Sequence, residues 1–277
     1  MKISVLYVTN RPGGFDVLRG NLERQTFRDF ELVIVDGYRK DREPVASCTF
    51  TYLSDPPRRE GAMTNLRAAC NEGLRRCEGE YVVFLQDYIW IPPSGIERFV
   101  RAQEKERGFY TGVGNVGEGP EKVGDGAITI WGEPYYGPPE RIRWEDPRIG
   151  MSNGPLRASP DAWEDNWACA PRDALVELGG YDEEYDMGGL TWGEKELASR
   201  AEALGYPIII DTTNRCMAWW HDGFWPNPLK RAPDRNELLF RRHQAELKAG
   251  RRVLRLPMEV KDEPVRTAAR TISDSRR

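Results

Sequence analysis

Two acidic residues follow short apolar runs and are placed where carboxylates can do chemistry. Asp36 comes directly after Leu32–Val35, and Asp87 comes one residue after Tyr81–Leu85. A short apolar run between polar or turn-forming residues predicts a strand that is buried on both faces. Because open α/β sheets bind ligands beyond the carboxyl ends of their strands, we expect both carboxylates at one pocket. Asp36 also fits a plain turn former before Gly37.

A third acid, Glu194, is predicted to lie in the first turn of a helix. Leu197, Ala201 and Leu204 recur at helical spacing after it. The positive end of the helix dipole favours an ionised carboxylate at this position, and a general base must be ionised. An exposed acid is also common in a first turn for the dipole reason alone, so the position does not by itself establish catalysis.

His221 is one of only two histidines and lies in a stretch rich in tryptophan. Trp219, Trp220 and Trp225 surround it in sequence. An imidazole in this setting fits either a metal ligand or a side chain packed among aromatic rings.

A mostly parallel sheet flanked by helices is the architecture that would bring these residues together. The order strand, helix, strand over residues 3–35 predicts a right-handed βαβ unit with parallel strands. Later helices follow apolar residues at helical spacing and end at glycines. The fold class is therefore predicted to be α/β. Expected strands cover residues 3–8, 32–35, 48–53, 81–85, 109–113, 127–131 and 207–211, and expected helices cover 15–25, 61–79, 171–180, 194–205 and 234–249.

Composition excludes several classes of protein. Hydrophobic residues make up 39% of the 277 residues, which is enough for a core and excludes global disorder. A net charge of -4 gives no electrostatic case for nucleic acid or an anionic membrane as the main partner. The five scattered cysteines form no Cys-x-x-Cys pair, so neither a disulfide framework nor a zinc knuckle is indicated. No apolar run has the length of a membrane span or of a signal peptide, which predicts a cytoplasmic protein.

The N-terminal half resembles family 2 glycosyltransferases, which have the GT-A fold and transfer sugars with inversion. Ser4–Pro12 is similar to the first strand and turn of that family, and Gln25–Gly37 is similar to its second strand. Asn71–Leu74, followed by Gly79–Tyr81 and Phe84-Leu85, resembles the approach to the metal-binding Asp-x-Asp motif.

The second half resembles the same family. Ala170–Glu183 is similar to the helix and Gly-Gly-aromatic-Asp-Glu segment before the acceptor side. Trp192–Leu197 is similar to the Trp-Gly-Gly-Glu-Asp stretch of galactosyltransferase-like members. The resemblance implies a GT-A domain over residues 1–225, with a nucleotide-sugar-binding half (1–107) and an acceptor and catalytic half (108–225). Residues 226–277 would form a C-terminal helix and a flexible tail.

The resemblance also implies roles for particular residues. A carboxylate, Glu194 or its competitor Glu196, would deprotonate an acceptor hydroxyl that attacks the anomeric carbon of the donor. Asp87 and His221 would hold a divalent metal, Mn²⁺ or Mg²⁺, because hard cations take oxygen ligands and Mn²⁺ tolerates one imidazole. Glu164, Asp165 and Trp192 would contact the acceptor, which would be a glycan, a protein or a small molecule. The donor, with UDP favoured by family habit, would contact Thr9, Asn10, Arg11, Asp36, Asn65, Arg67, Gln86, Asp87 and Tyr88.

The chain departs from the family pattern at the metal motif. Where the family has Asp-x-Asp, this chain has Gln86-Asp87-Tyr88, so only the middle residue is acidic. This departure leaves open a GT-A-like protein that binds a sugar nucleotide or a glycan without catalysis. A nucleotidyltransferase is disfavoured, because no glycine-rich, lysine-bearing loop lies near residue 10. The arginines Arg58, Arg59 and Arg67 fit either diphosphate ligands or solvated surface charges.

Overall fold

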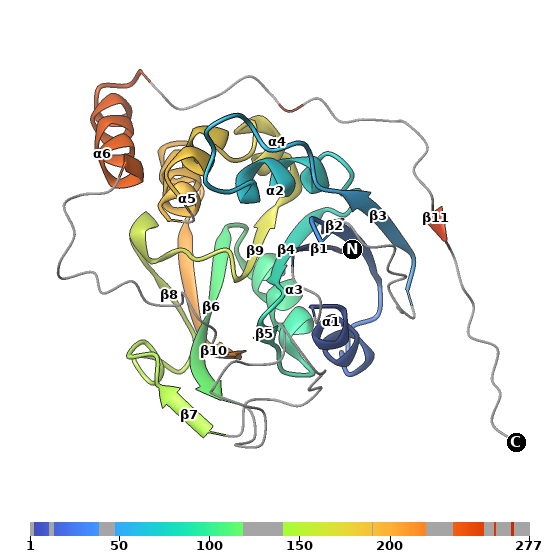
Figure 1. Ribbon diagram of the computed structural model, residues 1–277. Coiled ribbons are helices and arrows are strands. Elements are labelled where there is room, and N and C mark those ends of the chain that lie inside the picture. Colours follow the sequence, from blue (N-terminus) through green and yellow to red (C-terminus); the bar gives the residue numbers. More distant parts are fainter. Residues whose placement is uncertain are drawn as a thin grey trace, which may run out of the picture.

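The computed structural model contains a single large sheet with helices on both of its faces (Figure 1). It describes residues 3–10, 14–38, 48–118, 141–189, 191–219, 235–251, 258 and 267–268. The helices are α1 (Gly14–Glu23), α2 (Leu66–Leu74), α3 (Gly95–Lys105), α4 (Arg172–Glu177), α5 (Gly193–Ala203) and α6 (Arg235–Lys248), with 3-10 helices η2 (Pro160–Ala162) and η3 (Glu183–Met187). The strands are β1 (Ile3–Thr9), β2 (Phe30–Asp36), β3 (Phe50–Ser54), β4 (Tyr81–Gln86), β5 (Ile89–Trp90), β6 (Phe109–Glu118), β7 (Arg141–Trp144), β8 (Pro155–Arg157), β9 (Trp167–Pro171), β10 (Ile208–Trp219) and β11 (Thr267–Ala268).

The sheet is parallel in its N-terminal half and mixed beyond it. The strand order is β11-β3-β2-β1-β4-β9-β6-β10-β5, with β7 and β8 at its margins. Strands β3, β2, β1 and β4 run parallel to one another, and β6 is parallel to β10. Strand β9 lies between β4 and β6 and is antiparallel to both. The predicted α/β class with a central sheet between helices is confirmed.

The central strands are unbroken apolar runs because each face of the sheet is covered by a layer of apolar side chains. Val83 and Leu85 of β4 belong to the layer beneath α1 and α3, whereas Val82 and Phe84 belong to the layer beneath α2, α4 and α5. Since successive strand residues point to opposite faces, both faces of β4 need apolar side chains. Figure 1 shows the two sets of helices on opposite sides of the sheet.

Three predicted elements differ from the structure in extent. The helix expected over residues 61–79 is shorter, since α2 runs from Leu66 to Leu74. The strand expected over 207–211 continues to Trp219, with an irregularity between Asp211 and Arg215. Pro171 ends β9, so the helix expected from this proline begins at Arg172. The strand expected over 127–131 lies outside the described residues.

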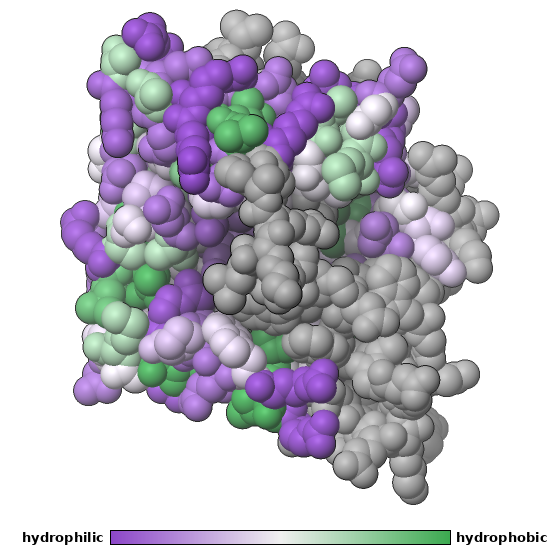
Figure 2. Space-filling view, turned by 60° about the vertical axis from the view of Figure 1, so that its left-hand side comes forward, coloured by the Kyte–Doolittle hydropathy of each residue, from purple (hydrophilic) through white to green (hydrophobic). Residues whose placement is uncertain are grey.

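The terminal helix predicted over 234–249 is α6, and it packs against α5 and η3. In the described part of the chain, no helix combines the length and apolar character that crossing a membrane requires. The described surface in Figure 2 is mostly hydrophilic, and its hydrophobic residues lie in separate small groups.

Candidate active site

The carboxyl ends of β1 and β2 bring the first polar residues together. Thr9 and Asp36 are register partners at the ends of these strands, and both are buried. The Asp36 carboxylate accepts hydrogen bonds from the Tyr38 amide (2.9 Å) and the Tyr52 hydroxyl (2.8 Å). Asn10 follows Thr9 and is exposed. Asp36 is thus a fixed hydrogen-bond acceptor at the rim of the sheet, and Arg11 lies outside the described residues.

The end of β4 lies beside β1 and carries the next pair of side chains. The Thr9 hydroxyl donates to Asp87 Oδ2 at 2.8 Å, so Asp87 points toward the end of β1. Gln86 turns the other way and donates from Nε2 to Asp165 Oδ1 at 3.0 Å. Asp36 and Asp87 therefore lie at the same edge of the sheet, as the strand pattern predicts, with Thr9 between them.

A divalent cation at the end of β4 would find the carboxylate of Asp87. Asp87 is buried and offers carboxylate oxygens, and the Thr9 hydroxyl is adjacent. The Trp219 amide donates to the Tyr88 carbonyl oxygen at 2.9 Å, so the end of β10 lies next to the end of β4. His221, the predicted second ligand, lies outside the described residues. A carboxylate together with an imidazole is a donor set that fits Mn²⁺.

A buried arginine links two further carboxylates to this edge. Arg67 of α2 is 2% exposed, and its Nη1 donates to Asp165 Oδ2 at 2.5 Å. Its Nη2 forms an ion pair with Glu194 Oε2 in the first turn of α5. The guanidinium also lies 5.0 Å from the centre of the Tyr181 ring. A continuous set of polar contacts therefore runs from Gln86 through Asp165 and Arg67 to Glu194.

Burial and charge act in opposite directions on this cluster. Burial raises the pKa of Glu194; Arg67 lowers that pKa, Asp165 raises it again, and the net shift is upward. Burial alone would lower the pKa of Arg67, but the charges of Asp165 and Glu194 outweigh it and raise this pKa. The arginine stays charged, and Glu194 is a stronger base when ionised than an exposed glutamate.

Asp186 of η3 fixes the start of the helix that carries Arg67. Its carboxylate accepts hydrogen bonds from the amides of Arg67 and Ala68, each at 3.0 Å, and from the Thr64 hydroxyl at 2.8 Å. A carboxylate at these amides satisfies donors that a helix N-terminus leaves open, and it complements the helix dipole. This cap could not be predicted from the sequence, because Asp186 lies more than a hundred residues after α2.

Glu196, the competing catalytic candidate, lies in a different environment from Glu194. It is fully buried and accepts two hydrogen bonds from Arg200, from Nε and Nη2, each at 2.9 Å. His243 Nδ1 of α6 is 3.8 Å from Glu196 Oε1. The structure therefore does not bring Glu196 together with Arg67, Asp165 and Glu194.

Glu196, His243 and Asp182 are close enough to one another to be considered as a metal group. The Arg200 guanidinium already neutralises the Glu196 carboxylate. A cation placed there would meet this positive charge at short range, so we assign the group to the packing of α6 rather than to the candidate site.

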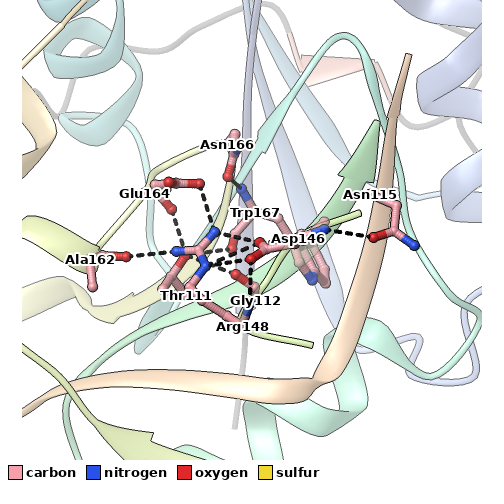
Figure 3. A network of polar contacts seen from close by, with 10 residues as sticks. Thr111, Gly112, Asn115, Asp146, Arg148, Ala162, Glu164, Asn166 and Trp167 are labelled. Atoms are coloured by element: carbon pink, nitrogen blue, oxygen red, sulfur yellow. Dashed lines mark hydrogen bonds and ion pairs between the residues drawn. The ribbon is translucent and has the colours of Figure 1, made fainter. Parts of the chain in front are cut away.

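Two of the predicted acceptor residues, Glu164 and Asp165, are neighbours in the chain. Glu164 is half exposed and pairs with Arg148, which also binds the buried carboxylate of Asp146 (Figure 3). Arg148 further donates to the Ala162 carbonyl oxygen at 3.2 Å. Asp146 and Arg148, which the sequence did not single out, thereby hold Glu164 and the chain just before it.

The remaining predicted residues make other contacts. Trp192 precedes α5 and stacks on Phe240 of α6, with ring centres 4.9 Å apart. Asn65 donates to Asp55 Oδ2 at 3.1 Å, beside the end of β3. Arg58 and Arg59 are exposed.

A small, mostly apolar pocket adjoins Gln86 and Asp165. It is lined by Leu6, Val8, Leu66, Cys70, Phe84, Leu85, Gln86 and Asp165.

The sequence and the fold have counterparts among known proteins. A family model described as glycosyl transferase family 2 matches residues 16–154, which is half of the chain. Comparison with curated protein sequences gave no match.

Solved glycosyltransferase structures share the fold at low sequence identity. Residues 1–349 of TarS from S. aureus, in complex with UDP, align with a TM-score of 0.53 and 13% identity, over 79% of this chain and 61% of that one. The mannosyltransferase PcManGT from Pyrobaculum calidifontis, in complex with GDP-Man and Mn²⁺, aligns with a TM-score of 0.54 and 16% identity, over 88% and 69%. GalNAc-T7, with UDP, GalNAc and Mn²⁺, aligns with a TM-score of 0.56 and 16% identity, over 90% and 51%. This chain thus spans about three fifths of the TarS chain and half of the GalNAc-T7 chain.

Proposed function

This chain belongs to glycosyl transferase family 2, and on that premise we propose that it transfers a sugar from a nucleotide-sugar donor to an acceptor hydroxyl. Its fold is the GT-A fold that the sequence resemblance implied. The observation that carries the proposal is the set of contacts from Gln86 through Asp165 and Arg67 to Glu194. These contacts join the ends of β1, β2 and β4, which we call the donor edge because we place the donor there, to a carboxylate suited to act as a base.

The donor is proposed to lie across the ends of β1, β2 and β4. Asp36 would accept hydrogen bonds from the nucleoside, since its position is fixed by Tyr38 and Tyr52. Thr9, Asn10, Arg11, Gln86 and Tyr88 would line the path of the diphosphate and the sugar. Arg67 is not proposed as a direct diphosphate ligand in this arrangement, because Asp165 and Glu194 already engage its guanidinium.

Glu194 is the proposed general base of an inverting displacement. Its Oε2 pairs with Arg67, and the acceptor proton would go to its other oxygen. The acceptor oxygen would then attack the anomeric carbon as the bond to the diphosphate breaks. The upward shift in the pKa of Glu194 brings it closer to a neutral working pH, which favours proton transfer from a weakly acidic hydroxyl. Asp165 shares Arg67 with Glu194, and Asp165 and Glu164 would orient the acceptor.

Asp87 and His221 are the proposed holders of a divalent metal at the donor site. A divalent cation bound there supplies positive charge that stabilises the leaving diphosphate. The chain itself places Asp87 with Thr9 and brings the end of β10 next to Tyr88.

A second candidate function is donor or glycan binding without transfer. It is favoured by one observation, which is that Gln86 and Tyr88 replace the acids that flank Asp87 in the family pattern. The Gln86 amide is also tied to Asp165 by a hydrogen bond rather than directed at Asp87.

Calorimetric titration with UDP-sugars and GDP-sugars, with and without Mn²⁺, separates the two candidates when it is combined with a turnover assay. Release of the nucleoside diphosphate in the presence of a panel of acceptor hydroxyls would support transfer. Donor binding without any release of the diphosphate would support the binding function. Absence of binding by every nucleotide sugar would contradict both sugar transfer and donor binding.

A further inference from the structure

The C-terminal helix α6 packs on the segment of chain that leads into α5. Its buried residues are Asn236, Phe240 and His243, which lie four and three residues apart and so share one face. Figure 1 shows α6 beside α5, at the margin of the molecule. The contacts of this face fall on η3, on α5 and on the residues before Glu194.

Asn236 is fully buried and holds the backbone between η3 and α5. Its Nδ2 donates to the carbonyl oxygens of Tyr185 (2.8 Å) and Thr191 (3.0 Å), and it lies 3.5 Å from that of Gly189. The approach is close enough that a Cβ atom on Gly188 would lie 2.2 Å from Asn236 Oδ1. One side chain of α6 therefore ties both ends of a short loop, and the loop needs glycine at residue 188 to admit it.

Phe240 supports a strained residue at the end of that loop. Trp192 has φ 74° and is the one residue other than glycine with a positive φ in the described part of the chain. A bulky residue adopts this left-handed conformation only where its surroundings hold it there. The Phe240 ring stacks on Trp192 at 4.9 Å, and the Trp192 carbonyl oxygen accepts the Glu196 amide at 2.9 Å in the first turn of α5. The conformation of Trp192 thus sets the direction in which α5, and with it Glu194, begins.

The loop between η3 and α5 also lies next to the start of α2, which carries Arg67, the partner of Glu194 in the ion pair. Asp186 lies between Tyr185 and Gly188, and it caps the start of α2 through the amides of Arg67 and Ala68. A shift of residues 185–192 would therefore displace Glu194 and the base of Arg67 together.

We propose that α6 is a brace for the catalytic ion pair, with Asn236 and Phe240 as positioning residues that act through Trp192 and the loop before it. The kinetic consequence rests on the proposed function, in which Glu194 is the base. The consequence for the loop itself does not depend on that function. Neither residue touches the donor edge of the sheet in the described structure.

The test compares Phe240→Ala and Asn236→Ala with Leu238→Ala, which removes an exposed side chain of the same helix. We expect the first two variants to lower kcat about tenfold or more, since a shift of about 1 Å in a catalytic group costs on the order of a hundredfold. Donor KM and the calorimetric donor Kd should stay unchanged. Phe240→Tyr keeps the ring and should restore kcat, and Leu238→Ala should match the unsubstituted protein in every measurement.

A coupling measurement shows whether Phe240 acts through Trp192. In a Trp192→Gly background the ring contact is gone and glycine adopts the left-handed conformation without strain. The loss of kcat caused by Phe240→Ala should therefore be much smaller in that background. Equal losses in both backgrounds would overturn the proposed route.

Amide hydrogen exchange gives a readout that does not need catalysis. Residues 185–197 should exchange faster in Phe240→Ala and Asn236→Ala, while β1 and β4 keep their protection. Unchanged exchange in this segment, or a loss of donor affinity equal to the loss of kcat, would overturn the brace. If the unsubstituted protein showed no transfer at all while the exchange result held, the proposed function would fail and the brace would stand.

Discussion

Replacing Arg67 with methionine tests the buried cluster that connects the sheet edge to Glu194. Methionine fills part of the same space but leaves Asp165 and Glu194 without the guanidinium they share. Both carboxylates are largely buried, with side-chain exposures of 8% and 13%. Removing one partner of a buried ion pair costs about 3–5 kcal/mol, because the charge left behind has no counter-charge. For a chain of this size we expect the Tm to fall by about 10 °C at neutral pH.

The stability lost in Arg67→Met should change with pH, and the shift in the pKa of Glu194 decides whether the loss grows or shrinks as the pH rises. This pKa is raised above its ordinary value of 4.5 by burial, although Arg67 opposes the shift. A group with a raised pKa in the folded state contributes stability below its ordinary pKa, and that contribution is lost as the pH rises through the folded pKa. Without Arg67 the pKa of Glu194 rises further. Each additional pKa unit adds about 1.4 kcal/mol to the loss of unfolding free energy at high pH. The destabilisation by Arg67→Met should therefore be smaller at pH 5 than at pH 8.

Urea unfolding at several pH values measures this dependence. Arg75→Met is the matched control, because Arg75 forms a partly exposed pair with Glu72 at the end of the same helix. An exposed pair of this kind contributes about 0–1 kcal/mol, so the control should lose little stability at any pH. A loss for Arg67→Met that equals that of the control, or that is the same at pH 5 and pH 8, would refute the reasoning.

Two further predictions concern the donor edge of the sheet. Asp87→Asn should remove the Mn²⁺-dependent part of donor affinity, as calorimetry with and without Mn²⁺ would show; an Mn²⁺ effect as large as before would rule out Asp87 as a ligand. Tyr52→Phe removes the hydroxyl that donates to Asp36 at 2.8 Å. We expect donor Kd to rise about tenfold, equivalent to about 1.4 kcal/mol; an unchanged Kd would contradict a nucleoside contact by Asp36.

The central strands could be predicted from the sequence because burial on both faces demands unbroken apolar runs. Strands β1, β2 and β4 lie where those runs predict them. Strand β9 was not predicted, since its five residues end in a proline and suggest the approach to a helix. It is buried because it lies between β4 and β6, which is a property of the sheet rather than of the segment. Helix α3 was not predicted either, although Ile96, Phe99 and Val100 have helical spacing.

The site could be predicted in part for the same physical reason. Asp36 and Asp87 could be placed at one edge because strand ends in one parallel sheet share an edge. The ion pairs of Arg67 could not be predicted, because its partners Asp165 and Glu194 are 98 and 127 residues away along the chain. Periodicity does not report pairing over such distances, so Arg67 was grouped with the exposed Arg58 and Arg59. Glu196 remained a competitor to Glu194 for the same reason, since its burial with Arg200 depends on how α5 and α6 pack.

The most direct test of the proposed function is the turnover of Glu194→Gln. Glutamine keeps the shape of the side chain but is not a base, and a general base contributes about a hundredfold to ten-thousandfold to the rate. We expect the rate of sugar transfer from the nucleotide sugar to fall by at least about a hundredfold, with the calorimetric donor Kd unchanged. Turnover equal to that of the unsubstituted protein would contradict the assignment of Glu194 as the catalytic base.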